Sequence, residues 1–176
     1  MEIRTMKCIR RGLAAAICGV WLAGCGEAER SEPAAIEITE STSCALDGML
    51  LAHFPGPKAQ VHFVGAEFPE YFCDTVEMFS IHLRPEQARL VQALYVQDMG
   101  KADWNAPRGH WIDARTAFYV VGSDAHGSMG PTIASFAQVA EAAAFRDQHG
   151  GEVLRFDEVT PDMVVLDGGV LNDQRM

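Results

Sequence analysis

The fold is decided by residues 59–83, AQVHFVGAEFPEYFCDTVEMFSIHL. Ala59–Gly65 predicts a strand that ends in a glycine turn, and Pro69–Cys73 predicts a second, short strand. Asp74–Leu83 has the apolar spacing of a helix, and its first residue is an aspartate that can cap it. Leu94–Asp98 predicts the strand after this helix, so the order is strand, strand, helix, strand (ββαβ).

The same order recurs in the second half of the chain. The expected strand, strand, helix and strand lie at Ala117–Gly122, Ile133–Phe136, Ala137–Gln148 and Val153–Phe156. We interpret this recurrence as an internal duplication, which predicts an α+β fold of two small ββαβ lobes, residues 44–105 and 106–165. A further strand is expected ahead of each unit, at Met49–His53 and at His110–Ala114.

The first 24 residues have the parts of a secretion signal. A cationic start precedes the apolar run Leu13–Ala23, which is too short to span a bilayer as a lasting helix. Leu22-Ala23-Gly24-Cys25 resembles the lipobox of bacterial lipoproteins; an ordinary signal peptide with a chance cysteine is the alternative. We therefore expect a signal peptide at residues 1–24 and lipidation at Cys25. The expected location is the cell envelope, facing the periplasm, with the anchor in the outer membrane.

Behind the lipidated cysteine, residues 26–43 are rich in Glu, Ser, Thr, Ala and Pro and lack apolar periodicity. This composition predicts that residues 25–43 form the anchor and a flexible linker. Such a linker spans roughly 20–25 Å, so a partner is expected at the same membrane surface. Residues 166–176 are expected to form a frayed C-terminal tail.

Charge excludes one class of partner. Without residues 1–24 the chain keeps 10 basic and 23 acidic residues, a net charge of −13. Proteins that bind nucleic acids need a basic footprint, so no nucleic-acid partner is expected. Basic surfaces and cations are the partners that this charge favours.

Two of the five cysteines remain after the leader and the lipidated residue are set aside, Cys44 and Cys73. In an oxidising compartment two thiols can form a disulfide, which is one alternative. The other is that Cys44 stays a free thiol and serves as a metal ligand. The sequence leaves both open.

The motif Cys44-Ala-Leu-Asp-Gly-Met49 places a thiol, a carboxylate and a thioether within six residues, and Gly48 lets the side chains converge. A thiolate with a thioether is the ligand pair that selects Cu(I), because both sulfurs are polarisable. A structural zinc site would be expected to show two close thiols. Cys44, Asp47 and Met49 are therefore predicted at a Cu(I) site; a chance turn is the alternative for a motif this short.

The second candidate region is the glycine-rich segment Gly122–Pro131. It exposes Met129, His126 and Asp124 with little apolar patterning to bury them. We predict that Met129 or His126 completes a low-coordinate copper site. Met78 lies on the apolar side of a predicted helix instead and is expected in the core.

Several longer strings occur in order along the chain: CALDGM (44–49), PGPKAQ (55–60), LYVQDMG (94–100), WIDAR (111–115), AFYVVG (117–122), MGPT (129–132) and GGEVLRF (150–156). Together, from Cys44 to Val159, they resemble the NosL family, accessory lipoproteins of nitrous-oxide reductase. Each string is weak alone, and the ordered set is highly specific.

The resemblance implies a Cu(I)-binding metallochaperone, not an enzyme, that is tethered in the periplasm. It implies delivery of copper to nitrous-oxide reductase, in denitrification, with help from a membrane ABC-type maturation complex. It also implies paired ββαβ lobes and a metal region at Cys44–Met49 with Met129. Many relatives read Cys-x-x-Cys-Gly-Met, and this chain has Asp47 at the second cysteine, so Asp47 is a ligand for an oxidised ion, a neighbour of the ligands, or a spectator.

Two other classes stay open. An enzyme similar to organomercurial lyase could use Cys44, Cys73 and Asp47 to protonate a carbon–mercury bond, although the expected lipid anchor and Met49 argue against it. An interaction module whose sulfurs are only structural is the third class. Whether two chains share one ion as a homodimer is open as well.

Overall fold

The computed structural model describes residues 32–164 and residue 166. The predicted signal peptide (1–24), Cys25, the first part of the predicted linker and residues 167–176 of the predicted tail lie outside the described residues. Within the described part, none of the helices has the length and apolar character that crossing a membrane requires. Residues 32–164 contain two α-helices and several small antiparallel sheets, so the predicted α+β class is confirmed.

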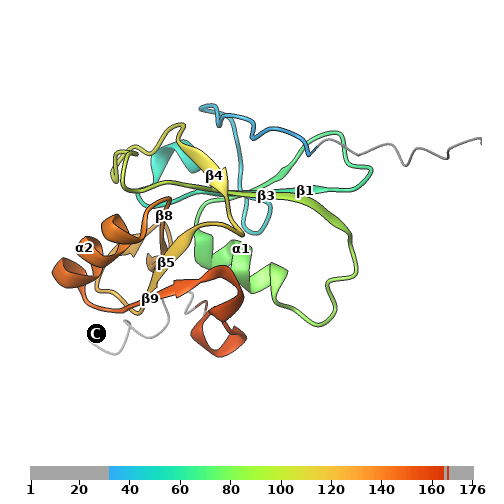
Figure 1. Cartoon of the computed structure of the whole chain (residues 1–176). Coiled ribbons are helices and arrows are strands. Elements are labelled where there is room, and N and C mark those ends of the chain that lie inside the picture. The colour runs from blue at the N-terminus through green and yellow to red at the C-terminus, as the bar shows by residue number, and fades with distance from the viewer. Residues whose placement is uncertain (1–31, 165, 167–176) are drawn as a thin grey trace, which may run out of the picture. The chain divides into compact units, whose positions relative to one another are not determined.

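The first sheet has the strand order β2-β1-β3-β4 (Figure 1). Its strands are β1 Ala59–Phe63, β2 Glu70–Phe72, β3 Val91–Gln97 and β4 Trp111–Asp113. Helix α1, Thr75–His82, follows β2, and the Asp74 side chain caps it by accepting a hydrogen bond from the Val76 amide, as the sequence predicts.

The second sheet has the order β8-β5-β9. Its strands are β5 Phe118–Val121, β8 Ala134–Phe136 and β9 Glu152–Arg155, with helix α2, Val139–His149, between the last two. A separate ribbon of β6 His126–Gly127 and β7 Gly130–Pro131 lies between β5 and β8 in the chain. In both sheets the first strand of the ββαβ unit is central, so the units share a topology; a duplication stays a prediction.

Two expected strands differ from the structure. Within Met49–His53, Leu50 makes a single bridge with Ser43, and Leu51–His53 is a 3-10 helix, η1. The strand expected at His110–Ala114 exists as β4 and precedes the second unit in the chain, but it pairs with β3 and therefore belongs to the first sheet. In both places the sequence pattern indicates apolar residues. It does not specify whether the segment pairs with a strand, or with which one.

One hydrophobic core joins the two sheets through α1. The Phe79 ring packs edge-on against Tyr119, 5.0 Å between centroids, and lies 5.3 Å from Phe156, which begins the 3-10 helix η2, Phe156–Glu158. A last 3-10 helix, η3, spans Pro161–Met163. Met78 is fully buried in the same core, as predicted.

The other face of the first sheet is covered by residues 32–43, which we call the strap. The Gln60 side chain exchanges two hydrogen bonds with the Ile36 backbone, at 2.9 and 3.0 Å, and the Tyr95 hydroxyl donates to the Pro33 carbonyl at 2.7 Å. Ile38 is only 4% exposed. In Figure 1 the strap (blue) and α1 (green) lie on opposite sides of β1 and β3. The expectation of a flexible linker is therefore wrong for residues 36–43.

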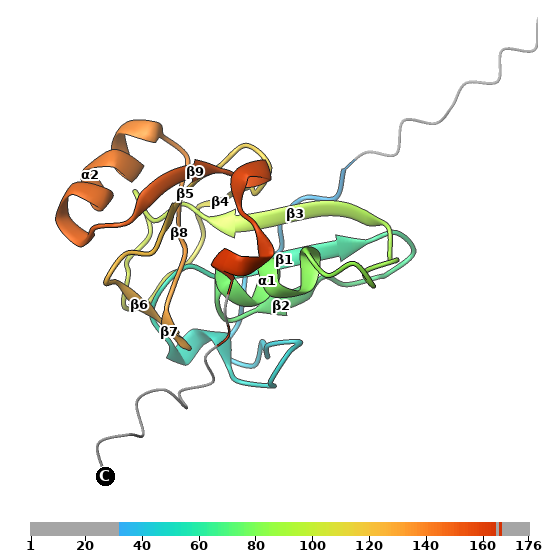
Figure 2. The same cartoon turned by 90° about the horizontal axis from the view of Figure 1, so that it is seen from below.

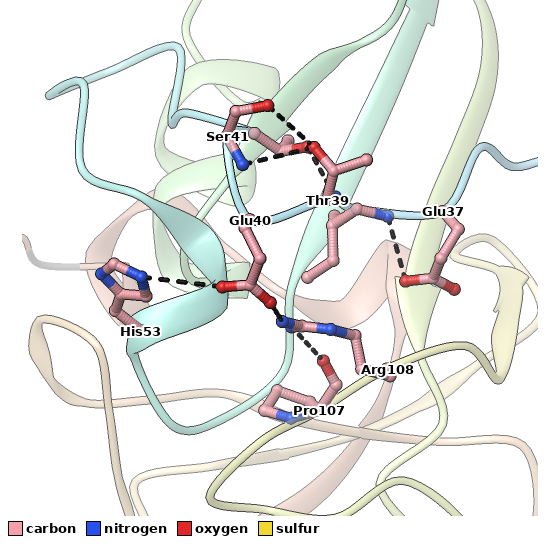
Figure 3. A network of polar contacts seen from close by, with 9 residues as sticks. Glu37, Thr39, Glu40, Ser41, His53, Pro107 and Arg108 are labelled. Carbon is pink, nitrogen blue, oxygen red and sulfur yellow. Dashed lines mark hydrogen bonds and ion pairs between the residues drawn. The ribbon is translucent and has the colours of Figure 1, made fainter.

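Ionic contacts hold the end of the strap near the start of the cysteine motif (Figure 3). Glu40 accepts a hydrogen bond from Arg108 at 2.8 Å, and its other oxygen lies 3.7 Å from His53 Nε2. Glu40 and His53 are exposed and Arg108 is partly buried, and such surface ion pairs contribute about 1 kcal/mol or less each. These ion pairs therefore help to define the path of the strap, and they contribute little to the free energy of unfolding.

Candidate metal centre

Cys44 begins a tight turn that its own backbone closes. The Cys44 amide donates to the Met49 carbonyl at 2.8 Å, and the Gly48 amide donates to the Cys44 carbonyl at 3.0 Å. Gly48 has φ 78°, a left-handed conformation that glycine adopts at little cost. Asp47 accepts from the Met49 amide at 2.9 Å. The motif therefore folds with Cys44 buried at its base and Asp47 exposed at its tip.

Cys73 lies beside Cys44, although 28 residues separate them in sequence. It is fully buried between β2 and α1, and both cysteines are free thiols. The Ala45 amide donates to the Tyr71 carbonyl at 2.7 Å, which fastens the cysteine turn to β2. The Cys73 carbonyl accepts from the buried Lys58 ammonium at 3.0 Å.

Glu77, in the first turn of α1, contacts both sulfurs. Its Oε2 lies 3.2 Å from the Cys44 sulfur and 3.2 Å from the Cys73 sulfur, and it accepts from the Cys73 amide at 3.0 Å. Glu77 is fully buried, and its Oε1 has no hydrogen-bond partner among the described residues. Glu77 is not among the ligands predicted from the sequence, although its spacing of four residues from Cys73 corresponds to one helical turn.

These side chains make a group of possible metal donors. Cys44, Asp47, Cys73 and Glu77 each offer one donor atom, and the four atoms lie within 4.8 Å of one another. Three of the four residues are buried. The set combines two soft sulfurs with two hard oxygens.

The two thiols differ in acidity. Hydrogen bonding with the Cys73 side chain lowers the pKa of Cys44, against the opposing effect of burial, and the backbone amides of Cys73 and Leu46 lower it further. The same interaction, together with burial, raises the pKa of Cys73. Cys44 is therefore the better thiolate of the pair.

Met129 comes to the same place from the β6–β7 ribbon. It forms the two-residue turn of that hairpin with Ser128, since His126 pairs with Pro131 and Gly127 with Gly130. Met129 is half-buried against the cluster of Ile38, Cys44, Leu51 and Cys73. Figure 2 shows β7 next to η1 (cyan), which carries Leu51.

The ribbon is also hydrogen-bonded to the site. The Ser128 hydroxyl donates to the Cys73 carbonyl at 2.7 Å and lies 3.1 Å from the Cys73 sulfur. Gly127 permits the close approach, because a Cβ there would collide with Asp74 Oδ2. A Cβ on Gly56 would likewise lie 2.8 Å from the Gly127 Cα.

The remaining predicted ligands are placed differently. Met49 is half-buried in the cysteine turn, where its backbone bonds Cys44 and Asp47. His126 is exposed and is not part of the four-residue donor group; it lines a surface cavity with Trp104, Asp124, Ala125, Phe145 and His149. The structure thus packs Met129 against the cluster that contains Cys44 and Cys73, and it places His126 at another surface.

Known proteins match both the sequence and the fold. The family model described as NosL matches residues 35–164. A copper-binding lipoprotein NosL of Stutzerimonas stutzeri is 43% identical over 152 residues, 84% of this chain and 78% of the relative. A protein with the same description from Achromobacter cycloclastes is 41% identical over 121 residues, 66% of this chain and 63% of the relative. The crystal structure of the copper chaperone NosL from Shewanella denitrificans matches with TM-score 0.69 and 41% identity, over 74% of this chain and 98% of that one.

Proposed function

This chain belongs to the NosL family, and we propose that it is a Cu(I) metallochaperone tethered to a membrane at Cys25. Its cargo would serve the maturation of nitrous-oxide reductase in denitrification, together with a membrane ABC-type complex. Relatives named copper-binding lipoproteins and a solved copper chaperone support the copper function. The lipoprotein names support the cell envelope as its location, and the periplasmic face and the outer membrane are part of the proposal.

The observation that carries the proposal is that Met129 packs against the apolar cluster that contains Cys44. A thiol of lowered pKa and a thioether are brought to one apolar cluster, although 84 residues separate them in sequence. Soft, polarisable sulfur donors favour Cu(I) over hard divalent ions. Cys44 is therefore assigned as the principal ligand, with Met129 and Met49 as thioether donors.

The arrangement also supports transfer by ligand exchange. Cys44 is buried, whereas Asp47 is exposed and Met49 half-buried in the same turn. A donor from an acceptor protein can approach the turn from its exposed side while Cys44 still holds the ion. Copper then passes between proteins without release as a free ion, provided that its coordination number is low.

The test is competition for Cu(I) against a chromophoric chelator under reducing conditions. Cys44→Ser is expected to lose tight Cu(I) binding and to keep its fold, because a serine hydroxyl is a hard donor that is rarely ionised near neutral pH. Circular dichroism of the metal-free variant is the control for folding. Wild-type retention of copper by Cys44→Ser would contradict the assignment.

Zinc is the necessary competitor in this assay, because two thiols and two carboxylates also suit Zn²⁺. An excess of Zn²⁺ is expected to leave bound Cu(I) in place. Delivery is tested separately by mixing the copper-loaded protein with metal-free nitrous-oxide reductase and measuring the copper acquired. If the protein binds Cu(I) but never loads the reductase, the proposed copper binding stands and nitrous-oxide reductase is not its acceptor.

An enzymatic function has one observation in its favour. Cys44, Cys73 and Asp47, the trio needed to protonate a carbon–mercury bond, lie in one group. Incubation with phenylmercury and excess thiol would release benzene if this chemistry occurs. The copper-chaperone proposal expects no benzene above the level given by Cys44→Ser.

A further inference from the structure

The cysteine motif supplies one thiol, and the fold places a second one next to it. We propose that Cys44 and Cys73 hold Cu(I) together as a dithiolate pair, which Glu77 orients in the metal-free protein. This inference rests on the proposed copper function and names the second sulfur donor of its site. Cys73 lies outside the motif, on the junction between β2 and α1.

The spacing of the two sulfurs suits one ion. The two sulfurs belong to a group of four donor atoms that all lie within 4.8 Å of one another, so 4.8 Å is the upper limit of their separation. Two metal–thiolate bonds of about 2.3 Å each span about 4.6 Å when they are in line and less when they are bent, so one ion can reach both sulfurs. The Ala45–Tyr71 backbone hydrogen bond of 2.7 Å already joins the cysteine turn to β2, so the pair can close on an ion by side-chain adjustment.

Glu77 directs both sulfurs to one point. Both lie 3.2 Å from the same oxygen, Oε2, which also accepts from the Cys73 amide at 3.0 Å. Binding of Cu(I) by two thiols forms two copper–sulfur bonds and releases two protons. When the sulfurs turn to the ion, the Cys73 amide still holds Glu77 in place.

Charge at the site can accommodate a dithiolate. A Cu(I) ion with two thiolates carries one net negative charge. Lys58 is fully buried and donates to the Cys73 carbonyl at 3.0 Å and to the Pro55 carbonyl at 2.7 Å. Its ammonium group lies beside Cys73 and also interacts electrostatically with Asp74 and Glu77, so it offsets part of the negative charge of the whole site.

A purely structural role of Cys73 explains fewer of these contacts than a ligand role does. A free cysteine is often buried as a small hydrophobic residue, and that role alone needs no polar partner. Here its sulfur contacts Glu77, which is fully buried and whose Oε1 is unpartnered among the described residues. Burying an unpaired carboxyl oxygen is unfavourable, and a ligand site accounts for its retention.

The first experiment compares Cu(I) affinity in wild type, Cys44→Ser, Cys73→Ala and Ser128→Ala by chelator competition under reducing conditions. Ser128→Ala is the matched control, since it removes a polar neighbour of Cys73 and no sulfur. Cys73→Ala is expected to weaken Cu(I) binding at least tenfold, and Ser128→Ala to change it less than threefold. Wild-type affinity in Cys73→Ala, with loss in Cys44→Ser, would overturn the dithiolate and leave the chaperone function standing. A wild-type protein that holds no Cu(I) would overturn both.

The second experiment leaves Cys73 intact, so that it does not depend on the folding of Cys73→Ala. In a Met49→Leu, Met129→Leu double variant, Cys44 and Cys73 are the remaining sulfurs of the site. X-ray absorption of its Cu(I) form is expected to give two sulfur neighbours. A single sulfur neighbour would overturn the inference.

Discussion

Ile38→Ala tests whether the strap (residues 32–43) is a folded part of the protein. Ile38 is 4% exposed and packs with Cys44, Leu51 and Cys73. Truncating a buried isoleucine to alanine costs about 2–5 kcal/mol. Each kcal/mol lowers Tm by roughly 2–4 °C in a protein of this size, so a decrease of at least about 4 °C is expected.

Ile36→Ala is the matched control, because the same residue type is 42% exposed in the same strap. Surface substitutions usually change stability by no more than about 0.5 kcal/mol, which corresponds to a Tm change of roughly 2 °C or less. The hydrogen bonds between Ile36 and Gln60 use the Ile36 backbone and survive this substitution.

Thermal unfolding and the alkylation rate of Cys44 by iodoacetamide are measured on the same samples. The strap ends in exposed ion pairs, so it can detach before the rest of the protein unfolds. Part of the stability that Ile38→Ala loses is then seen as faster alkylation of Cys44 rather than as a lower Tm. Equal Tm and equal alkylation rates in the two variants would refute the docking of the strap.

Three further substitutions test other contacts. Gly127→Ala is expected to lower Tm and to weaken Cu(I) retention, because its Cβ collides with Asp74 Oδ2 and pushes away the ribbon that carries Met129; unchanged values of both would contradict this. Met129→Leu preserves volume, so stability of the metal-free protein should change by less than about 1.5 kcal/mol while Cu(I) affinity falls; lower stability with intact affinity would make Met129 a packing residue. Burial lowers the pKa of His82, so the unfolded chain binds its proton more readily and His82 reduces stability as pH falls below about 6.5. His82→Phe should therefore lose less of its urea midpoint between pH 7.5 and 5.5 than wild type does, and equal losses would count against this assignment.

Sequence patterns correctly predicted those helices and strands whose formation depends on neighbouring residues in the chain. The helix α1 and its Asp74 cap follow from apolar spacing and one side-chain acceptor. The strand at His110–Ala114 was found, but its partner was not, because pairing with β3 depends on the path of the chain between them. Residues 36–43 were assigned to a linker because their few apolar residues show no period; Ile38 is buried because it packs with Cys44, Leu51 and Cys73.

The same distinction explains why the motif reading gave an incomplete site. A motif identifies donors only by their spacing along the chain. Judged in this way, Cys44 has no second thiol beside it, because position 47 is an aspartate. The fold counts donors by position, and it places Cys73 and Glu77 within 4.8 Å of Cys44 and Asp47. The β1–β2 pairing and the cap of α1 fix where Cys73 lies, and the Ala45–Tyr71 hydrogen bond fixes where the turn lies. A thiol missing from position 47 can thus be supplied by the neighbouring strand–helix junction, where no search limited to the motif would find it.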